Sequence, residues 1–96
     1  MYEVRTTAQF DSWVASLGDI NAQARVFARL SNMAKGNFGD WKSVGGRVLE
    51  SRIHYGAGYR LYFMRDGSSV VLLLSGGDKS SQSRDILRAQ VLAAAY

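Results

Sequence analysis

The spacing of the apolar residues changes twice along this chain of 96 residues. They recur every three to four positions before about residue 35, every second position between residues 48 and 74, and again every three to four positions near the C-terminus. A period near 3.6 is typical of a helix packed on one side, and a period of 2 is typical of a strand. The pattern therefore predicts helices on either side of a block of strands, in one domain over residues 1–96.

The segment before residue 35 predicts a short strand over residues 2–5 and then two helices. Thr6 and Gln9 have the spacing of a capping box, Gly18 is a natural end for the first helix, and Asp19 can cap the second. The expected apolar face of the first helix is Phe10, Trp13, Val14 and Leu17. That of the second helix is Ile20, Ala24, Phe27, Leu30 and Ala34. Because the connection is so short, we expect an antiparallel helical hairpin.

The strand block divides into three strands at residues 48–54, 59–64 and 70–74. The third is apolar on both faces, which predicts a central strand covered on two sides. Asp66 and Gly67 provide a turn signal between the last two, and Gly76-Gly77 predicts a tight turn after the third. A final helix is expected from Ser80 or Ser81 to about Ala95. The predicted fold class is therefore α+β with the order β-α-α-β-β-β-α. We expect a small, mainly antiparallel sheet that packs against the helical hairpin and is followed by a C-terminal helix.

Composition limits the kinds of site that this chain can form. Twelve Lys and Arg residues oppose eight Asp and Glu residues, and the net charge of +4 favours a polyanion or an acidic protein as partner. With one His and no Cys, the chain lacks the spacing of a metal site, so we expect no metal and no cofactor. The N-terminal segment does not resemble a signal peptide, and no apolar run is long enough to span a membrane. We therefore expect a cytoplasmic protein.

Several cationic side chains are predicted to converge. Arg52 and His54 lie two positions apart on the first strand of the block, so they share a face with Glu50. Arg60 lies on the second strand opposite its core residues, and we expect it to be exposed. Lys79 lies just before the last helix, whose N-terminus favours phosphate.

Cations, one imidazole and tyrosines together are suited to metal-free chemistry on a phosphodiester. Arginines stabilise the charge that develops on phosphorus, and an imidazole exchanges a proton near neutral pH. The expected RNA contacts are Tyr55, Tyr62, Arg84 and Arg47, with the tyrosines able to stack on unpaired bases. The alternative is purely structural, since a lone histidine or a charged strand residue often has no catalytic role.

Two segments, residues 50–63 (ESRIHYGAGYRLYF) and 72–82 (LLLSGGDKSSQ), resemble the core sequence of RelE/ParE-family toxins. Within that family they are similar to the HigB-like addiction-module killer proteins. The resemblance implies a bacterial, cytoplasmic toxin of a type II toxin–antitoxin system, which a cognate antitoxin protein neutralises. It also implies one of two targets. RelE- and HigB-like members enter the ribosome and cut mRNA, whereas ParE-like members poison DNA gyrase.

The resemblance assigns roles to individual residues. Arg60 matches the strand arginine of the RelE-like active site, Arg52 lies near one of its two lysines, and Lys79 lies near its second arginine. HigB-like ribonucleases use histidine, which makes His54 the candidate base. The chain departs from the pattern in three respects. Glu50 stands near the place of the other lysine, and Ile86 stands near that of a C-terminal tyrosine. Tyr96 lies too late in the chain to replace that tyrosine.

We therefore expect a ribosome-dependent mRNA interferase with Arg52, His54, Arg60 and Lys79 as catalytic residues. A ParE-like gyrase poison without nuclease activity is the alternative, and a basic binding domain that has lost toxicity is a third. The expected partners are the antitoxin together with the ribosome and mRNA, or DNA gyrase in the alternative.

Overall fold

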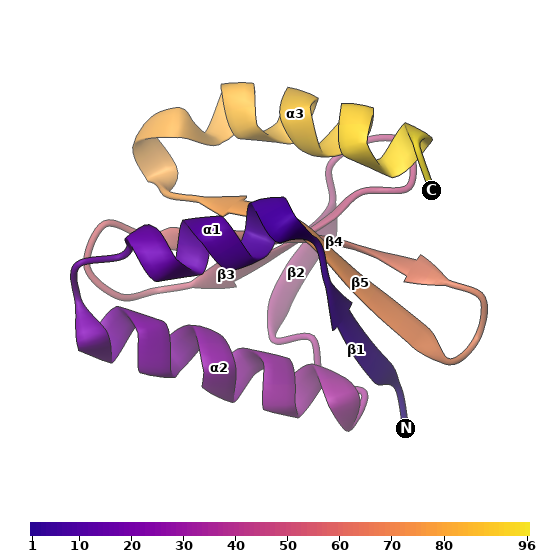
Figure 1. Ribbon diagram of the computed structural model, residues 1–96, viewed down its shortest axis with the longest axis horizontal. Coiled ribbons are helices and arrows are strands. Elements are labelled where there is room, and N and C mark those ends of the chain that lie inside the picture. Colours follow the sequence, from indigo (N-terminus) through magenta and orange to yellow (C-terminus); the bar gives the residue numbers. More distant parts are fainter.

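The computed structural model describes residues 1–96 as three helices and five strands in one mixed sheet (Figure 1). The elements follow one another as β1 (Glu3–Thr6), α1 (Ala8–Ser16), α2 (Ile20–Ala34), β2 (Asp40–Ser43), β3 (Leu49–Ile53), β4 (Tyr59–Asp66), β5 (Val70–Gly77), a short 3₁₀ turn (Lys79–Ser81) and α3 (Gln82–Ala94). The α+β class, the helical hairpin, the strand meander and the C-terminal helix are confirmed. The predicted order was wrong in one respect, because β2 lies in a segment that we expected to be loop.

The sheet has the strand order β1-β5-β4-β3-β2. The pairs β2–β3, β3–β4 and β4–β5 are antiparallel, while β1 runs parallel to β5. The sheet is thus mainly antiparallel, as expected. The free edges are β1 on one side and the exposed strand β2 on the other.

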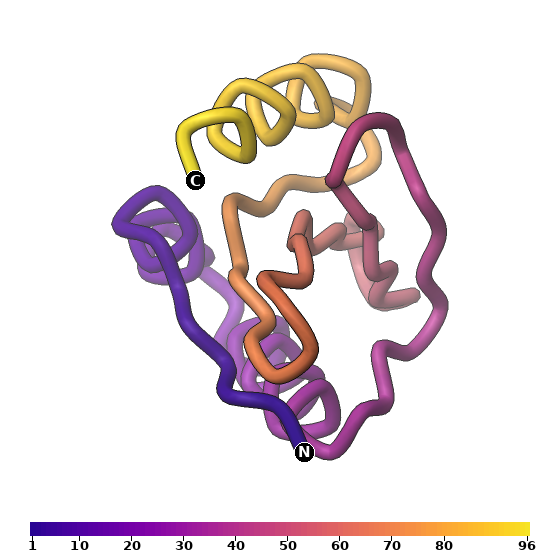
Figure 2. The backbone as a smooth tube through the Cα atoms, turned by 90° about the vertical axis from the view of Figure 1, so that its right-hand side faces the viewer, coloured from indigo at the N-terminus to yellow at the C-terminus, as the bar shows by residue number.

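Helices cover both faces of the sheet, and the two apolar faces of β5 explain why. Val71 and Leu73 join the core beneath α1 and α2, whereas Leu72 and Leu74 join a second core beneath α3. Figure 2 shows α3 running across the top of the strands, away from the α1–α2 pair. The prediction that residues 70–74 form a central strand buried on both sides is therefore confirmed.

The buried face of α2 differs from the predicted one. Its inward residues are Ala22, Val26 and Met33, while Phe27 is 57% exposed and Ile20 is also exposed. Helix α2 carries apolar residues on more than one side, so periodicity alone did not identify the side that packs on the sheet. Its cap at Asp19 is confirmed, because the Asp19 carboxylate accepts from the backbone N–H groups of Asn21 and Ala22.

The cap of α1 also differs from the prediction, by one residue. Thr7 rather than Thr6 is the N-cap, and its hydroxyl accepts from the backbone N–H of Phe10.

Gly76 and Gly77 lie within β5 instead of forming the predicted turn. A side chain at Gly76 would overlap the Trp13 ring of α1, and one at Gly77 would overlap the buried carboxylate of Asp85 on α3. The two glycines thus allow a helix to approach each face of the sheet closely.

Replacing Gly77 with alanine is expected to lower the free energy of unfolding by about 3 kcal/mol, since overfilling a packed site has costs of this order. The added methyl group must displace Asp85, which is hydrogen-bonded to Ser81. The matched control is Gly18→Ala, which meets no atom within 4 Å and should change stability by less than about 0.5 kcal/mol. Urea denaturation followed by tryptophan fluorescence measures both. Equal urea midpoints for Gly77→Ala and Gly18→Ala would contradict the close approach of Asp85 to Gly77.

Candidate functional site

The candidate site begins with one row of side chains across the sheet. Arg52 on β3 pairs directly with Arg60 on β4, and Asp40 on β2 pairs with Arg52 on its other side. Directly opposed residues in antiparallel strands project from the same face. The prediction that the two arginines share a face is therefore confirmed.

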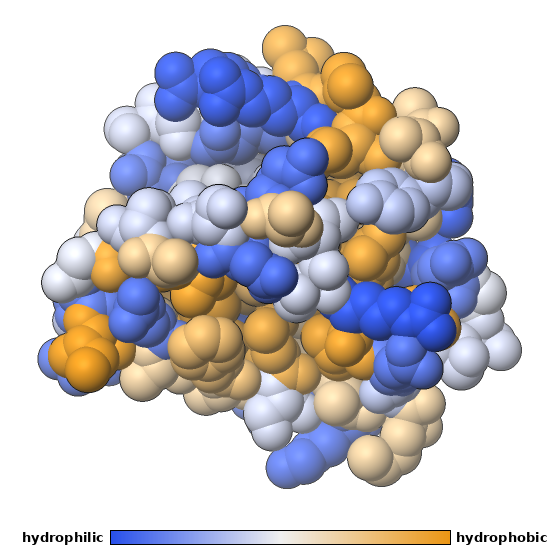
Figure 3. Space-filling model, in the orientation of Figure 1, coloured by the Kyte–Doolittle hydropathy of each residue, from blue (hydrophilic) through white to orange (hydrophobic).

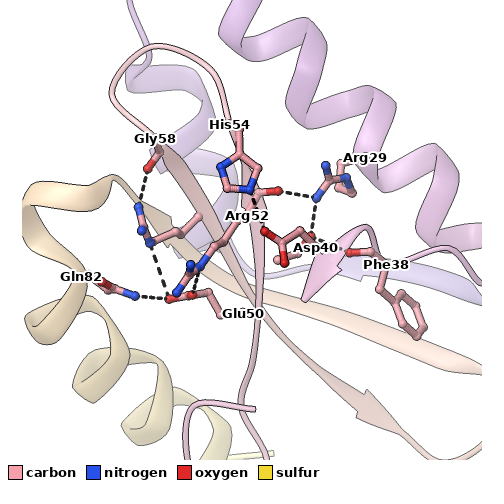
Figure 4. Close-up of polar contacts among 10 residues, drawn as sticks. Arg29, Phe38, Asp40, Glu50, Arg52, His54, Gly58 and Gln82 are labelled. Atoms are coloured by element: carbon pink, nitrogen blue, oxygen red, sulfur yellow. Dashed lines mark hydrogen bonds and ion pairs between the residues drawn. The ribbon is translucent and has the colours of Figure 1, made fainter. Parts of the chain in front are cut away.

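A buried carboxylate, that of Glu50, contacts both arginines, and Figure 4 shows it beside Arg52. Glu50, which is fully buried, accepts a hydrogen bond from Arg52 Nε at 2.9 Å and lies 3.8 Å from Arg60 Nε. Its second oxygen also accepts a hydrogen bond from Gln82 Nε2 of α3 at 2.9 Å. Glu50 thereby ties β3, β4 and the start of α3 together at one point.

The charge of Glu50 is stabilised in spite of its burial. Burial raises the pKa of this carboxyl, but the hydrogen bonds from Gln82 and Arg52 and the charges of Arg52 and Arg60 lower it further, so the pKa lies below its usual value. Glu50 is therefore an anion at neutral pH, and it offsets part of the positive charge of the pair.

The two arginines differ in their access to solvent. The side chain of Arg52 is 30% exposed, whereas Arg60 is only 8% exposed as a residue. Arg60 Nη1 donates to the carbonyl oxygen of Gly58 at 2.8 Å. The expectation of an exposed Arg60 was wrong, because α3 covers the part of this face formed by β4 and β5.

His54 follows β3 directly and is hydrogen-bonded to Asp40. Its Nε2 lies 2.7 Å from Asp40 Oδ2, and its side chain is 72% exposed. The hydrogen bond with His54 is the main cause that lowers the pKa of Asp40, and the charges of Arg52 and Arg29 add to it. An imidazole held by a carboxylate in this way has a fixed orientation and one free ring nitrogen, which suits a general base.

Arg29 supports the site from the opposite face of the sheet. Its Nη1 donates to Ser51 Oγ at 2.7 Å and to the carbonyl oxygen of Arg52 at 2.8 Å, and Ser51 Oγ donates to the carbonyl oxygen of Phe38. Partial burial lowers the pKa of Arg29. The contacts of Arg29 become visible only in the fold, because Ser51 and Arg52 lie on β3, far along the chain from α2.

Lys79 and Arg84 lie near this cluster at the start of α3. Together with four polar residues between them they line an open hollow of about 360 Å³. Lys79 also packs close to Gly58, whose carbonyl oxygen accepts from Arg60. The structure therefore brings Lys79 toward the arginine pair, and Arg84 to the outer side of the same hollow.

Two of the predicted RNA contacts, Tyr55 and Arg47, lie away from the arginine pair, and a third, Tyr62, lies opposite Glu50 but is buried, so its predicted stacking on a base was wrong. Tyr55 lies on the hairpin side, where its hydroxyl donates to Asp19 and Arg25 stacks on its ring. Tyr62 is fully buried beneath α3, where no base can stack on it, and burial raises its pKa. Arg47 lies at the other end of α3 and donates to the backbone oxygen of Tyr96.

His, Asp and Glu side chains nowhere gather in a group of three that would bind a metal ion. The chain also contains no helix with the length and hydropathy needed to cross a membrane.

The chain is thus an α+β protein with a cluster of paired arginines and carboxylates at one end of its central strands. It is 45% identical over 91 residues to an uncharacterized protein of Haemophilus influenzae strain Rd, an alignment that covers 95% of this chain and 92% of that protein. The chain therefore belongs to the same family as this relative. No family model matches the chain. No solved structure matches it either.

Proposed function

We propose that this protein is the toxin of a type II toxin–antitoxin system with the RelE/ParE fold, and that it acts in the cytoplasm as a ribosome-dependent mRNA interferase. The observation that carries the proposal is the row Asp40, Arg52 and Arg60, with His54 bound to Asp40 beside it. His54 would act as the proton acceptor, and Arg52 and Arg60 would provide positive charge for the phosphate at the same end of the sheet. The resemblance of residues 50–63 and 72–82 to HigB-like toxins supports the same function.

In the proposed reaction the ribose 2′-OH of the mRNA attacks the adjacent phosphate. With its Nε2–H held by Asp40, His54 accepts the 2′-OH proton at Nδ1. The bond to the 5′ oxygen of the next nucleotide breaks, this oxygen takes a proton from solvent water, and His54 returns its proton to solvent. The products are a 2′,3′-cyclic phosphate and a 5′-hydroxyl end. Because the nucleophile belongs to the substrate, it is already close to the phosphorus atom.

The arginines and the lysine stabilise the phosphate in this reaction. Glu50 holds Arg52 through its Nε, which leaves the two terminal nitrogens of Arg52 free to bind phosphate oxygens. Arg60 is largely buried, so it adds positive charge from beneath the exposed surface of the site. Lys79, at the exposed rim, assists the phosphate or the leaving oxygen.

The expected protein partner is a cognate antitoxin that offers an acidic or amphipathic segment. The net charge of +4 would speed its capture by electrostatic steering. The rate of association should therefore fall markedly as salt increases.

A ParE-like gyrase poison is the alternative, and Glu50 is the observation that favours it. A buried carboxylate offsets part of the positive charge at the point where an RNA phosphate would bind. In that case the hairpin and the C-terminal region would bind gyrase.

Controlled expression in a bacterium distinguishes the two functions. We expect growth arrest together with new mRNA 5′ ends that are phased with codons and appear only on translated messages. We also expect no inhibition of supercoiling by purified gyrase. Growth arrest without such ends, accompanied by gyrase inhibition, would replace the ribonuclease proposal with the alternative. Normal growth at high expression would contradict both.

A further inference from the structure

Helix α3 has an outward face that the fold leaves uncovered. Its inward residues Asp85, Ala89 and Ala93 pack on the sheet. On the outside, Leu87 is 64% exposed and Val91 is 73% exposed. Isolated exposed apolar residues are ordinary in proteins, but these two lie one turn apart on the same face of a helix.

Basic residues alternate with these apolar residues. Arg84, Leu87, Arg88 and Val91 have the spacing i, i+3, i+4 and i+7, so they form one continuous stripe along α3, which we call the α3 stripe. Arg84 and Arg88 are exposed and form no ion pair, since the salt bridges of this protein involve only Arg5, Arg52, His54 and Arg60. Figure 3 shows hydrophobic surface over the α3 part of the molecule next to a strongly hydrophilic strip.

The stripe also borders a groove. Leu87, Arg88, Val91 and Leu92 of α3 line a hollow of about 400 Å³ together with Gln9 of α1. No acidic side chain lines this hollow. A helix with an apolar edge and acidic flanks would place the apolar edge in the groove and its carboxylates beside the arginines.

We propose that the α3 stripe and the groove beside it are the docking site for an acidic amphipathic helix of a partner protein. The charge of the stripe selects this occupant over a neutral or basic helix. Arg84 belongs both to the stripe and to the polar hollow at the start of α3. A partner bound to the stripe therefore also neutralises one cation at the rim of the candidate site. The docking proposal concerns only the binding of a partner to α3, so it does not depend on whether the protein cuts RNA.

The test uses a labelled synthetic helical peptide with leucines at i, i+3, i+4 and i+7 and glutamates on both flanks, titrated with the full chain by fluorescence anisotropy. We expect saturable binding, and at least about tenfold weaker binding for a control peptide with lysines in place of the glutamates. Val91→Asp should weaken binding of the acidic peptide by about tenfold or more, because it places a charge in the apolar part of the site. The matched control is Ser31→Asp, which adds the same charge on the exposed surface of α2 and should leave binding unchanged.

Two further measurements complete the test. Arg88→Ala should weaken binding by about threefold at low salt and by less at 0.5 M salt, since exposed charges are screened. Equal effects of Val91→Asp and Ser31→Asp, or equal binding of the two peptides, would overturn the proposal. So would a dimer of the protein alone that Val91→Asp converts to a monomer, because a second copy would then be the occupant. Thermal melts of the variants verify that each remains folded.

Discussion

Replacing His54 with glutamine is expected to slow mRNA cleavage on ribosomes by about 10²- to 10³-fold, the range in which a lost general base is usually observed. Glutamine keeps the polar contact with Asp40 but cannot accept the 2′-OH proton. Asp40→Asn should have a smaller effect in the same direction, since the imidazole is then held less firmly. Single-turnover cleavage of a defined message on purified ribosomes measures both rates.

The control for this prediction is Lys35→Ala, which removes an exposed cation at the C-cap of α2 that makes no salt bridge with the candidate site. It should cut as fast as the unaltered protein. Because His54 and Asp40 are exposed, their variants should unfold at the same urea concentration as the parent. Cleavage by His54→Gln at the parent rate would remove histidine from the mechanism.

Replacing Glu50 with alanine is expected to cost about 3 kcal/mol or more of folding stability. Removing one partner of a buried ion pair leaves the other charge without compensation, and losses of this size are typical. Arg60 would then be buried beside an empty space, and Gln82 would lose its acceptor. The double variant Glu50→Leu/Arg60→Leu should be more stable than Glu50→Ala, because the buried charge of Arg60 is removed as well, while the remaining partner Arg52 is partly exposed to solvent.

The contribution of Glu50 also depends on pH, and its direction follows from the pKa. Because folding lowers the pKa of Glu50 from its usual 4.5, the charged carboxylate stabilises the fold at pH values well above 4.5, and this stabilisation disappears as the pH falls through the lower pKa of the folded state. The gap in unfolding free energy between the parent and Glu50→Gln should therefore be widest near pH 7 and narrow toward pH 3. Urea titrations followed by tryptophan fluorescence at each pH would show it. A gap that stays constant would mean that Glu50 contributes no charge-dependent stability.

Much of the fold was predictable because local patterns agreed with tertiary packing. The alternation in residues 59–64 placed Leu61 and Phe63 beneath the hairpin, and the doubly apolar segment 70–74 indicated a strand covered on both faces. The prediction failed where two patterns competed or none existed. Helix α2 has apolar residues on two sides, and β2 is an exposed edge strand without apolar alternation.

The sequence predicted the candidate site only where strand periodicity determines which face of the sheet a residue lies on. Strand periodicity placed Arg52 beside Arg60, but it gave no information on what α3 covers, so the burial of Tyr62 and Arg60 was missed. The partners of His54 and Arg29 were missed for a related reason. Asp40 lies on β2, a strand that the sequence did not reveal, and Ser51 lies on a predicted strand whose contact with α2 is set only by the tertiary fold.

The parallel pairing of β1 with β5 has a consequence for how the nascent chain folds. Glu3 pairs with Val70, a separation of 70 − 3 = 67 residues, so the first strand has no neighbour in the sheet until most of the chain has been synthesised. Contacts this distant in sequence slow folding, because a long loop must close before they form. The sheet therefore reaches its full width only after β5 has been synthesised, so the N-terminal strand waits for a partner that is made near the end of translation.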